Sequence, residues 1–250
     1  MDKQRLVLNT LVLQAEQERG VTQPELVRQL LSLNVHQIEL RREYQSGQLA
    51  ELRALNDLRL RHRLVYFYSI PDDLFVDGQV NPQLIQYVAE AAAMGASYLK
   101  MTLGDFENTT DFTADQVLRW LPENMHLNIE NDQTVTNTAP DKLTAFFQTF
   151  TASPNKVGFV NDLGNWVFTQ RDTFAMTRKL LPFTRFVHLK NYRLDAHQVP
   201  QTVAFDQGEL NIEELLHQFS PELPVALEYP TTLTALQHDI ATLTSKEDVD

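Results

Sequence analysis

Apolar residues recur along the chain in eight short runs, and each run is followed by a stretch with helical periodicity. The runs are rich in Val, Ile, Leu, Phe and Tyr and have the length of buried strands. Strands that alternate with helices are typical of a parallel sheet. The eight predicted strands cover residues 5–13, 35–41, 63–70, 97–104, 126–131, 156–163, 186–191 and 224–229.

The stretches that follow most of the runs place apolar residues three and four positions apart, as Leu84 and Val88 illustrate. This spacing predicts amphipathic helices. For one of them, Asn81 predicts an N-cap, Pro82 a first helical residue and Gly95 a C-terminal stop. The eight predicted helices cover residues 23–33, 47–62, 81–95, 113–121, 139–150, 171–181, 211–219 and 232–243.

Eight strand–helix units in 250 residues favour a closed (β/α)8 TIM barrel of the α/β class. No long linker divides them, so we expect a single domain over residues 1–250, with a short flexible tail at about 245–250. A doubly wound sheet is the alternative. It would require a glycine-rich phosphate loop after the first strand, and the sequence has no such loop and only 8 glycines.

The chain is acidic, with a formal net charge of −12 and a pI of about 5.0. Such a surface repels nucleic acids and anionic membranes, so we expect neither as a partner. The absence of cysteine excludes disulfides and thiolate metal sites. The first 20 residues carry only a short apolar stretch and lack the pattern of a signal peptide, which predicts a cytoplasmic protein.

Four polar residues stand at the ends of four of the predicted strands: Glu130, Asp162, His188 and Glu228. The carboxyl ends of barrel strands meet at the catalytic face, so these side chains should converge. A buried carboxylate is costly unless it is paired, and a divalent cation would supply the partner. Any one of them alone is more often a cap or an ion pair, but all four in register indicate a metal site.

Side chains alternate between the two faces of a barrel strand. His188 and Lys190 therefore share a face, and both should reach the pocket, with Lys190 nearer its mouth. Asn128 shares a face with Glu130 in the same way.

Short motifs around these positions resemble the xylose isomerase-like TIM barrel superfamily, which contains the sugar phosphate isomerases and epimerases. They are IEND at 129–132, NDLGNW at 161–166, VHLKNY at 187–192 and LEYP at 227–230. The resemblance extends from Val35 to about Leu243 and rests on the order and spacing of the motifs. The superfamily also holds dehydratases, so the resemblance indicates fold and metal better than substrate.

The resemblance implies that Glu130, Asp162, His188 and Glu228 bind one divalent metal ion. Mn²⁺ is the first expectation for this oxygen-rich set, with Mg²⁺, Co²⁺ and Zn²⁺ as alternatives. In the epimerases, the glutamates of the fifth and eighth strands exchange the substrate proton from opposite faces. We therefore expect Glu130 and Glu228, together with Lys190, to act in catalysis through an enediolate whose charge the metal stabilises.

Further residues are expected to bind the substrate. Lys100 and Lys190 are candidates for contacts with a carboxylate, a phosphate or a carbonyl oxygen. Glu39 stands where the superfamily often has a carboxylate, and we expect it to hold a substrate hydroxyl or to pair with a nearby arginine. Asn165 and Trp166 would position a loop over the pocket, although packing is an equal expectation for Trp166.

The first functional hypothesis is a metal-dependent isomerase or epimerase of a small sugar, keto-sugar or sugar phosphate. A dehydratase of the inosose or dehydroshikimate type, acting in the same site, and a non-catalytic polyol-binding barrel are the alternatives. The partner would be a small sugar or polyol, and barrels of this kind often form homodimers. One departure from the family pattern is Asn191, where an Asp usually follows the lysine.

Overall fold

Eight parallel strands form a closed ring in the computed structural model, which describes residues 1–108 and 112–244. The ring runs β2-β1-β11-β8-β7-β6-β5-β3 and closes through pairing of β3 with β2. The strands are β1 (Leu6–Asn9), β2 (Gln37–Arg41), β3 (Val65–Val76), β5 (Tyr98–Gly104), β6 (His126–Glu130), β7 (Val157–Asp162), β8 (Thr184–Leu189) and β11 (Val225–Leu227). The predicted (β/α)8 barrel is thereby confirmed, whereas the predicted tail at 245–250 lies outside the described residues.

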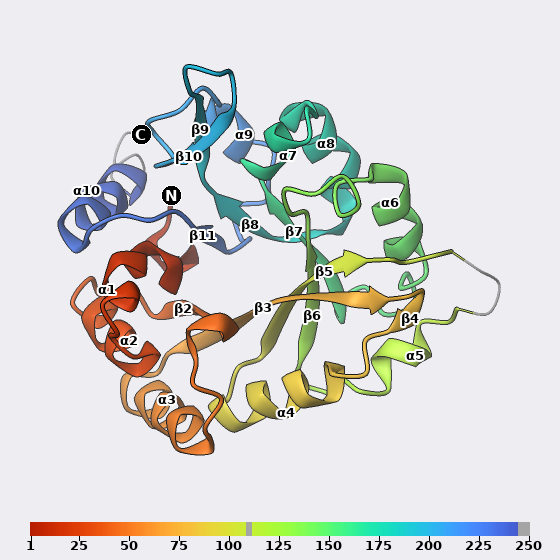
Figure 1. Ribbon diagram of the computed structural model, residues 1–250, viewed down its shortest axis with the longest axis horizontal. Helices are drawn as coiled ribbons and strands as arrows, with labels where there is room; N and C mark the ends of the chain where they lie inside the picture. The colour runs from red at the N-terminus through yellow and green to blue at the C-terminus, as the bar shows by residue number, and fades with distance from the viewer. Residues whose placement is uncertain (109–111, 245–250) are drawn as a thin grey trace.

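Helices surround the strands as an outer ring (Figure 1). They are α1 (Gln14–Glu18), α2 (Gln23–Leu31), α3 (Leu49–His62), α4 (Leu84–Met94), α5 (Asp115–Leu118), α6 (Pro140–Gln148), α7 (Asn165–Phe168), α8 (Thr173–Leu180), α9 (Ile212–Leu216) and α10 (Leu233–Thr244). None of the helices in the described ranges is long and apolar enough to cross a membrane.

The ends of α4 show how local signals set helix boundaries. Gly95 ends the helix with a φ of +73°, in the left-handed region that glycine adopts without strain, as predicted. The predicted N-cap at Asn81 is wrong, because the helix begins later in the chain, with its N-cap at Gln83. The Asn81 side chain accepts a hydrogen bond from the backbone N–H of Gln83, which makes a turn before the helix begins at Leu84.

The first predicted strand, residues 5–13, is too long. Only Leu6–Asn9 is extended, and a 3₁₀ helix at Thr10–Leu13 follows it. The cause is Asn9, whose side-chain oxygen accepts from the backbone N–H of Leu11 at 2.9 Å and caps that helix. Because apolar residues are buried on both sides of the turn, the hydrophobic pattern carries no sign of it.

Two layers of side chains fill the inside of the barrel. The lower layer is apolar and buried, and consists of Val7, Phe67, Val160, Phe186 and Ala226. Side chains on one face of a strand recur every second residue, so the next positions along these strands form a second layer nearer the carboxyl ends. This upper layer is polar and buried, and includes Asn9, Glu39, Lys100, Glu130, Asp162, His188 and Glu228.

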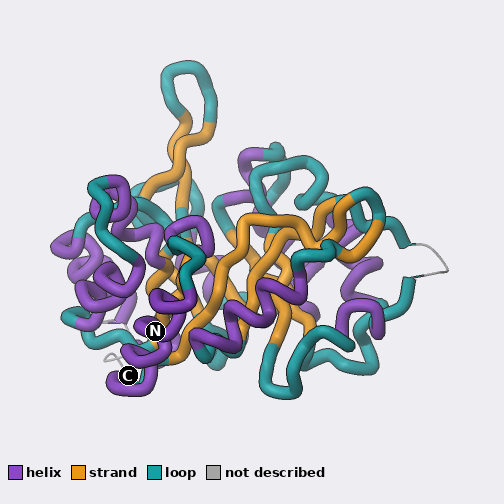
Figure 2. The backbone as a smooth tube through the Cα atoms, turned by 60° about the horizontal axis from the view of Figure 1, so that its bottom comes forward, coloured by secondary structure: helices purple, strands orange, loops and turns teal. Residues whose placement is uncertain are grey.

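An unpredicted hairpin follows β8 after a single residue. It consists of β9 (Asn191–Leu194) and β10 (Pro200–Val203), which pair in antiparallel fashion, and Figure 2 shows it standing out from the body of the barrel. Its sequence is short and largely polar, which explains why the apolar pattern did not indicate it.

Asn191 fastens the base of this hairpin. Its side-chain N–H₂ donates to the carbonyl oxygens of Phe205, at 2.8 Å, and Leu210, at 3.0 Å. Its side-chain oxygen accepts from the backbone N–H of Leu210 at 2.9 Å. An aspartate could not donate to the two carbonyls, so the departure from the family pattern has a structural reason.

We predict that Asn191→Asp destabilises the protein by about 2–5 kcal/mol, because the buried carbonyl of Phe205 and the half-buried carbonyl of Leu210 lose their donor. The matched control is Asn211→Asp at the exposed N-cap of α9. Aspartate caps a helix as well as asparagine does, so that change should stay within about 1 kcal/mol. Urea unfolding followed by circular dichroism measures both, and equal stabilities would contradict the assigned role of Asn191.

Candidate metal centre

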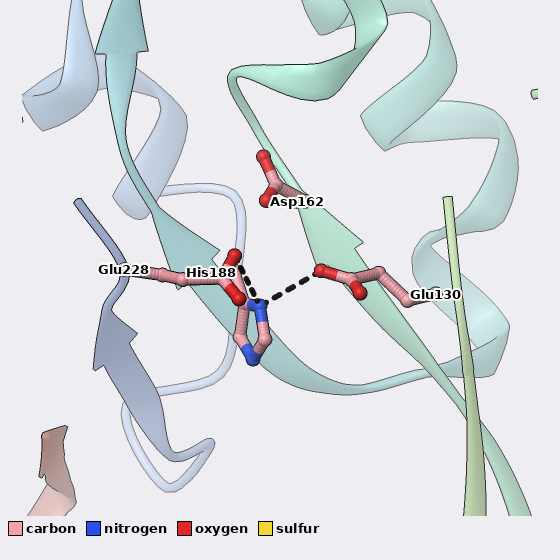
Figure 3. A group of neighbouring side chains, drawn as sticks. All are labelled: Glu130, Asp162, His188 and Glu228. Atoms are coloured by element: carbon pink, nitrogen blue, oxygen red, sulfur yellow. Dashed lines mark hydrogen bonds and ion pairs between the residues drawn. The ribbon is translucent and has the colours of Figure 1, made fainter. Parts of the chain in front are cut away.

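The four predicted ligands converge inside the upper layer. Glu130, Asp162, His188 and Glu228 come from the ends of β6, β7, β8 and β11, and one ligand atom from each lies within 4.8 Å of the others. All four are buried. Figure 3 shows the carboxylates of Glu130 and Glu228 approaching His188, with Asp162 close by.

His188 occupies the centre of the group. Its Nδ1 lies 2.8 Å from Glu130 Oε1 and 3.0 Å from Glu228 Oε2. The ring stands edge-on to Phe186 of the apolar layer, with a centroid distance of 4.7 Å. It is the single buried histidine of the seven in the chain, and the other six are exposed or half-buried. β8, which carries both Phe186 and His188, therefore holds the imidazole among the carboxylates.

The second oxygen of each carboxylate is held from outside the group. Glu130 Oε2 pairs with the ammonium group of Lys100. Glu228 Oε1 lies 3.1 Å from Nη1 of Arg41. Asp162 Oδ1 accepts from two backbone N–H groups of the loop that follows β7, those of Gly164 and Asn165, both at 2.9 Å. Each carboxylate thus has one oxygen fixed and one available to the centre.

The available atoms fit a divalent cation. Glu130 Oε1 and Asp162 Oδ2 are buried and make no hydrogen bond within the described residues, although charged groups lie within ion-pair distance. In the polar layer, the carboxylates of Glu39 and of the three acidic ligands face the ammonium groups of Lys100 and Lys190 and, at the edge of the layer, the guanidinium group of Arg41. With a neutral His188, negative charge is in excess, and a divalent ion would compensate it. Three carboxylates and one imidazole suit Mn²⁺, Mg²⁺, Co²⁺ or Zn²⁺.

Burial and neighbouring charges move the pKa values of the ligands apart. Burial raises the pKa of Asp162 to about 7, against the opposing effect of Lys190. Burial also acts to raise the pKa of Glu130, but the charges of Lys100 and His188 outweigh it and lower this pKa to about 2. For His188, burial acts to lower the pKa, and the surrounding carboxylates raise it well above its usual value.

Both lysines singled out in the sequence lie beside the ligands. Lys190 follows β8, and its Nζ is 2.6 Å from Asp162 Oδ2 and 3.2 Å from Glu228 Oε2. Lys100 reaches Glu130 from the neighbouring strand β5. Both lysines are almost fully buried.

The residues of the loop after β7 have different surroundings. Asn165 donates its side-chain N–H₂ to the carbonyl of Asn131, and its own side-chain oxygen is buried without a hydrogen bond in the described residues. Trp166 is fully buried and donates to the side chain of Asn161. It packs near Phe159, which shares the outward face of β7 with Asn161, so its surroundings are those of a packing residue.

Three polar residues outside the predicted ligand set support the ligands. Asn9 donates to Glu39 Oε2 at 2.8 Å and to Glu228 Oε1 at 3.2 Å. Asn131 exchanges two hydrogen bonds of 2.9 Å with the backbone of Asp162. Arg41 contacts Glu228, as described above. Each stands at or near a strand end, and that position was the available signal.

The ligand group is distinct from a cleft of about 630 Å³ that opens between α9 and α10. That cleft is lined by residues such as Phe205, Ile212, Leu216 and Leu243, and none of its lining residues belongs to the polar layer. Ligand chemistry, and not cavity size, therefore identifies the candidate site.

No family model matches the chain, and no curated protein matches it in sequence. Solved structures do match. The probable 3-DHS dehydratase AsbF of Bacillus anthracis is 15% identical, with a TM-score of 0.68 over 96% of this chain and 98% of that one. The IolI protein with a bound zinc atom is 12% identical, with a TM-score of 0.68 over 96% and 95%. An L-ribulose 3-epimerase is 16% identical, with a TM-score of 0.61 over 94% and 86%.

A further structural match is described as a fusion of a xylose isomerase-like TIM barrel with a 4-hydroxyphenylpyruvate dioxygenase. It is 12% identical, with a TM-score of 0.67 over 92% of this chain and 39% of that one. The chain has the fold of the xylose isomerase-like TIM barrels, as its motifs predicted. At these identities the similarity defines the fold, and the chemistry has to be argued from the site.

We predict that the purified protein binds about one divalent ion per chain and that His188→Ala abolishes this binding, because the central ligand is lost. His197→Ala, at the exposed tip of the hairpin, is the matched control and should bind like the wild type. Inductively coupled plasma mass spectrometry after loading with Mn²⁺ measures the content. Equal metal in the two variants would contradict the ligand set.

We also predict that metal affinity rises between pH 6 and pH 8. The pKa of Asp162 is about 7 and that of His188 is well above its usual value, so both groups hold protons in the metal-free protein at pH 6. Metal ligation requires both to be deprotonated, so binding releases about one to two protons near pH 6.5. Isothermal titration calorimetry in buffers of different ionisation enthalpy measures this release, and an affinity independent of pH would refute it.

Proposed function

We propose that the protein is a divalent-metal-dependent isomerase or epimerase of a small keto-sugar or sugar phosphate. The observation that carries the proposal is the position of Glu130 and Glu228, which approach the Nδ1 of His188 from β6 and β11. Two carboxylates that flank one site can remove a proton from one face of a substrate and return it to the other. The structural similarity to L-ribulose 3-epimerase and to D-allulose 3-epimerase from Methylomonas supports this reading.

Glu130, Asp162, His188 and Glu228 would hold the metal ion, for which Mn²⁺ is the first candidate. When bound, the ion supplies Lewis acidity that polarises a substrate carbonyl and acidifies the neighbouring C–H. The pKa values of Glu130 and Glu228 are lowered, because nearby cations outweigh burial, so both are ionised and able to accept a proton.

The surrounding residues would orient the two bases and stabilise charge. Lys100 and Arg41 fix the outer oxygens of Glu130 and Glu228, so each carboxylate keeps a defined orientation toward the site. The ammonium group of Lys190 is placed to stabilise negative charge that develops on a substrate oxygen. Lys100 and the free side-chain oxygen of Asn165 are further candidates for substrate contacts.

We predict that Glu130→Gln and Glu228→Gln each lower solvent deuterium exchange into the substrate by about 100-fold or more, because each removes a proton-transfer group. The assay incubates Mn²⁺-loaded protein with a panel of keto-sugars and their phosphates in deuterium oxide and follows the mass of the recovered sugars. Glu222→Gln, on the exposed surface, is the matched control and should exchange like the wild type.

Other results would select a different function. Undiminished exchange in Glu130→Gln would exclude that residue as a base. A new enone absorbance, with loss of water from the substrate, would favour a dehydratase acting in the same site. Sugar binding that survives metal removal, without turnover of any compound, would favour a polyol-binding barrel.

A further inference from the structure

Glu39 lies beside His188 in the same polar layer and is closed off from solvent. Its exposed fraction is 0%, whereas the lysines of the site retain 7–8%. Glu39 Oε2 lies 3.0 Å from His188 Nε2. This contact is on the side of the ring opposite the Nδ1 that faces Glu130 and Glu228. Glu39 therefore contacts a predicted metal ligand directly, and its role in holding a substrate hydroxyl stays a prediction.

The two ring nitrogens of His188 therefore have different neighbours. A neutral imidazole carries its proton on one nitrogen and a lone pair on the other, and the neighbour of the first decides which is which. Carboxylates lie beside both nitrogens, Glu39 beside Nε2, and Glu130 and Glu228 beside Nδ1. A divalent ion held by the ligand carboxylates would take the lone pair of Nδ1, which leaves the proton on Nε2, facing Glu39.

Asn9 fixes the carboxylate of Glu39 in turn. The two residues are register partners on β1 and β2, and the side-chain N–H₂ of Asn9 donates to Glu39 Oε2 at 2.8 Å. The same N–H₂ reaches Glu228 Oε1 at 3.2 Å. The side-chain amide of Asn9 thus connects Glu39, the neighbour of His188, to the ligand Glu228.

We propose that Glu39 is a positioning residue for the metal centre, which holds His188 as the Nε2–H tautomer and aims Nδ1 at the ion. This inference rests on the proposed metal site. Carboxylates that accept the second N–H of a ligating histidine raise its basicity and fix its ring, and their loss weakens metal binding by about 10–100-fold. Glu39 therefore acts on metal affinity through His188.

The test compares Zn²⁺ affinity, by competition with a fluorescent chelator, in wild-type protein, Glu39→Leu and Glu39→Gln. Leucine offers no acceptor to Nε2, so we expect binding about 10–100-fold weaker. Glutamine keeps an acceptor oxygen and should restore most of the affinity. Glu222→Gln, on the exposed surface, is the matched control and should bind like the wild type. Affinity in Glu39→Leu within about twofold of wild type would overturn the proposal.

A second measurement does not depend on the folding of a variant. Long-range ¹H–¹⁵N NMR of Zn²⁺-loaded wild-type protein reports the tautomer of His188, identified by the signal that His188→Gln lacks. The proposal requires the proton on Nε2, and a proton on Nδ1 would overturn it. If the wild type binds no metal at all, the proposed function fails. If the wild type binds metal and Glu39→Leu binds it equally well, only the role of Glu39 fails.

Discussion

The compensation of four buried carboxylates is the constraint on which the polar end of this barrel depends. An ionised carboxylate moved out of water costs several kcal/mol even after the surroundings relax, so each needs a defined partner. Lys100, Lys190 and loop N–H groups supply part of the compensation, and His188 supplies another part from the centre. A divalent ion would complete it. The same contacts hold one oxygen of each ligand still, which prepares the site before anything binds.

The polar group rests on the apolar layer of the barrel, which closes the site from below. Phe186 lies under His188, and Val160 and Ala226 take the equivalent places below Asp162 and Glu228. A two-residue step along each of these strands passes from the apolar layer to the buried polar layer. The strands therefore fix the positions of the predicted ligands.

The parts of the site that could be predicted are those that depend on one strand at a time. The period of two and the strand ends were enough to find Glu130, Asp162, His188 and Glu228 as neighbours. Relations between strands could not be predicted in this way. The contact of Asn9 with Glu39 follows from the register of β1 against β2, which the pattern within either strand does not specify.

Loop geometry was equally beyond the sequence pattern. The turn after β7 places Trp166 in the outer core, although the residue follows closely on a ligand strand. The end of β1 at Asn9 depends on one side-chain hydrogen bond, and a hydrophobic run gives no indication of it. The eight-strand architecture was predictable because it depends on many apolar residues at once, whereas these details each depend on one polar contact.

The way Asn191 fastens its hairpin separates two parts of the molecule that are adjacent in sequence. The polar layer on β8 ends at Lys190, and the side chain of Asn191 bonds to the backbone of the chain that returns from the hairpin. A change in the length or sequence of residues 192–203 would therefore begin beyond this anchor, and the positions of the predicted ligands would not depend on it directly.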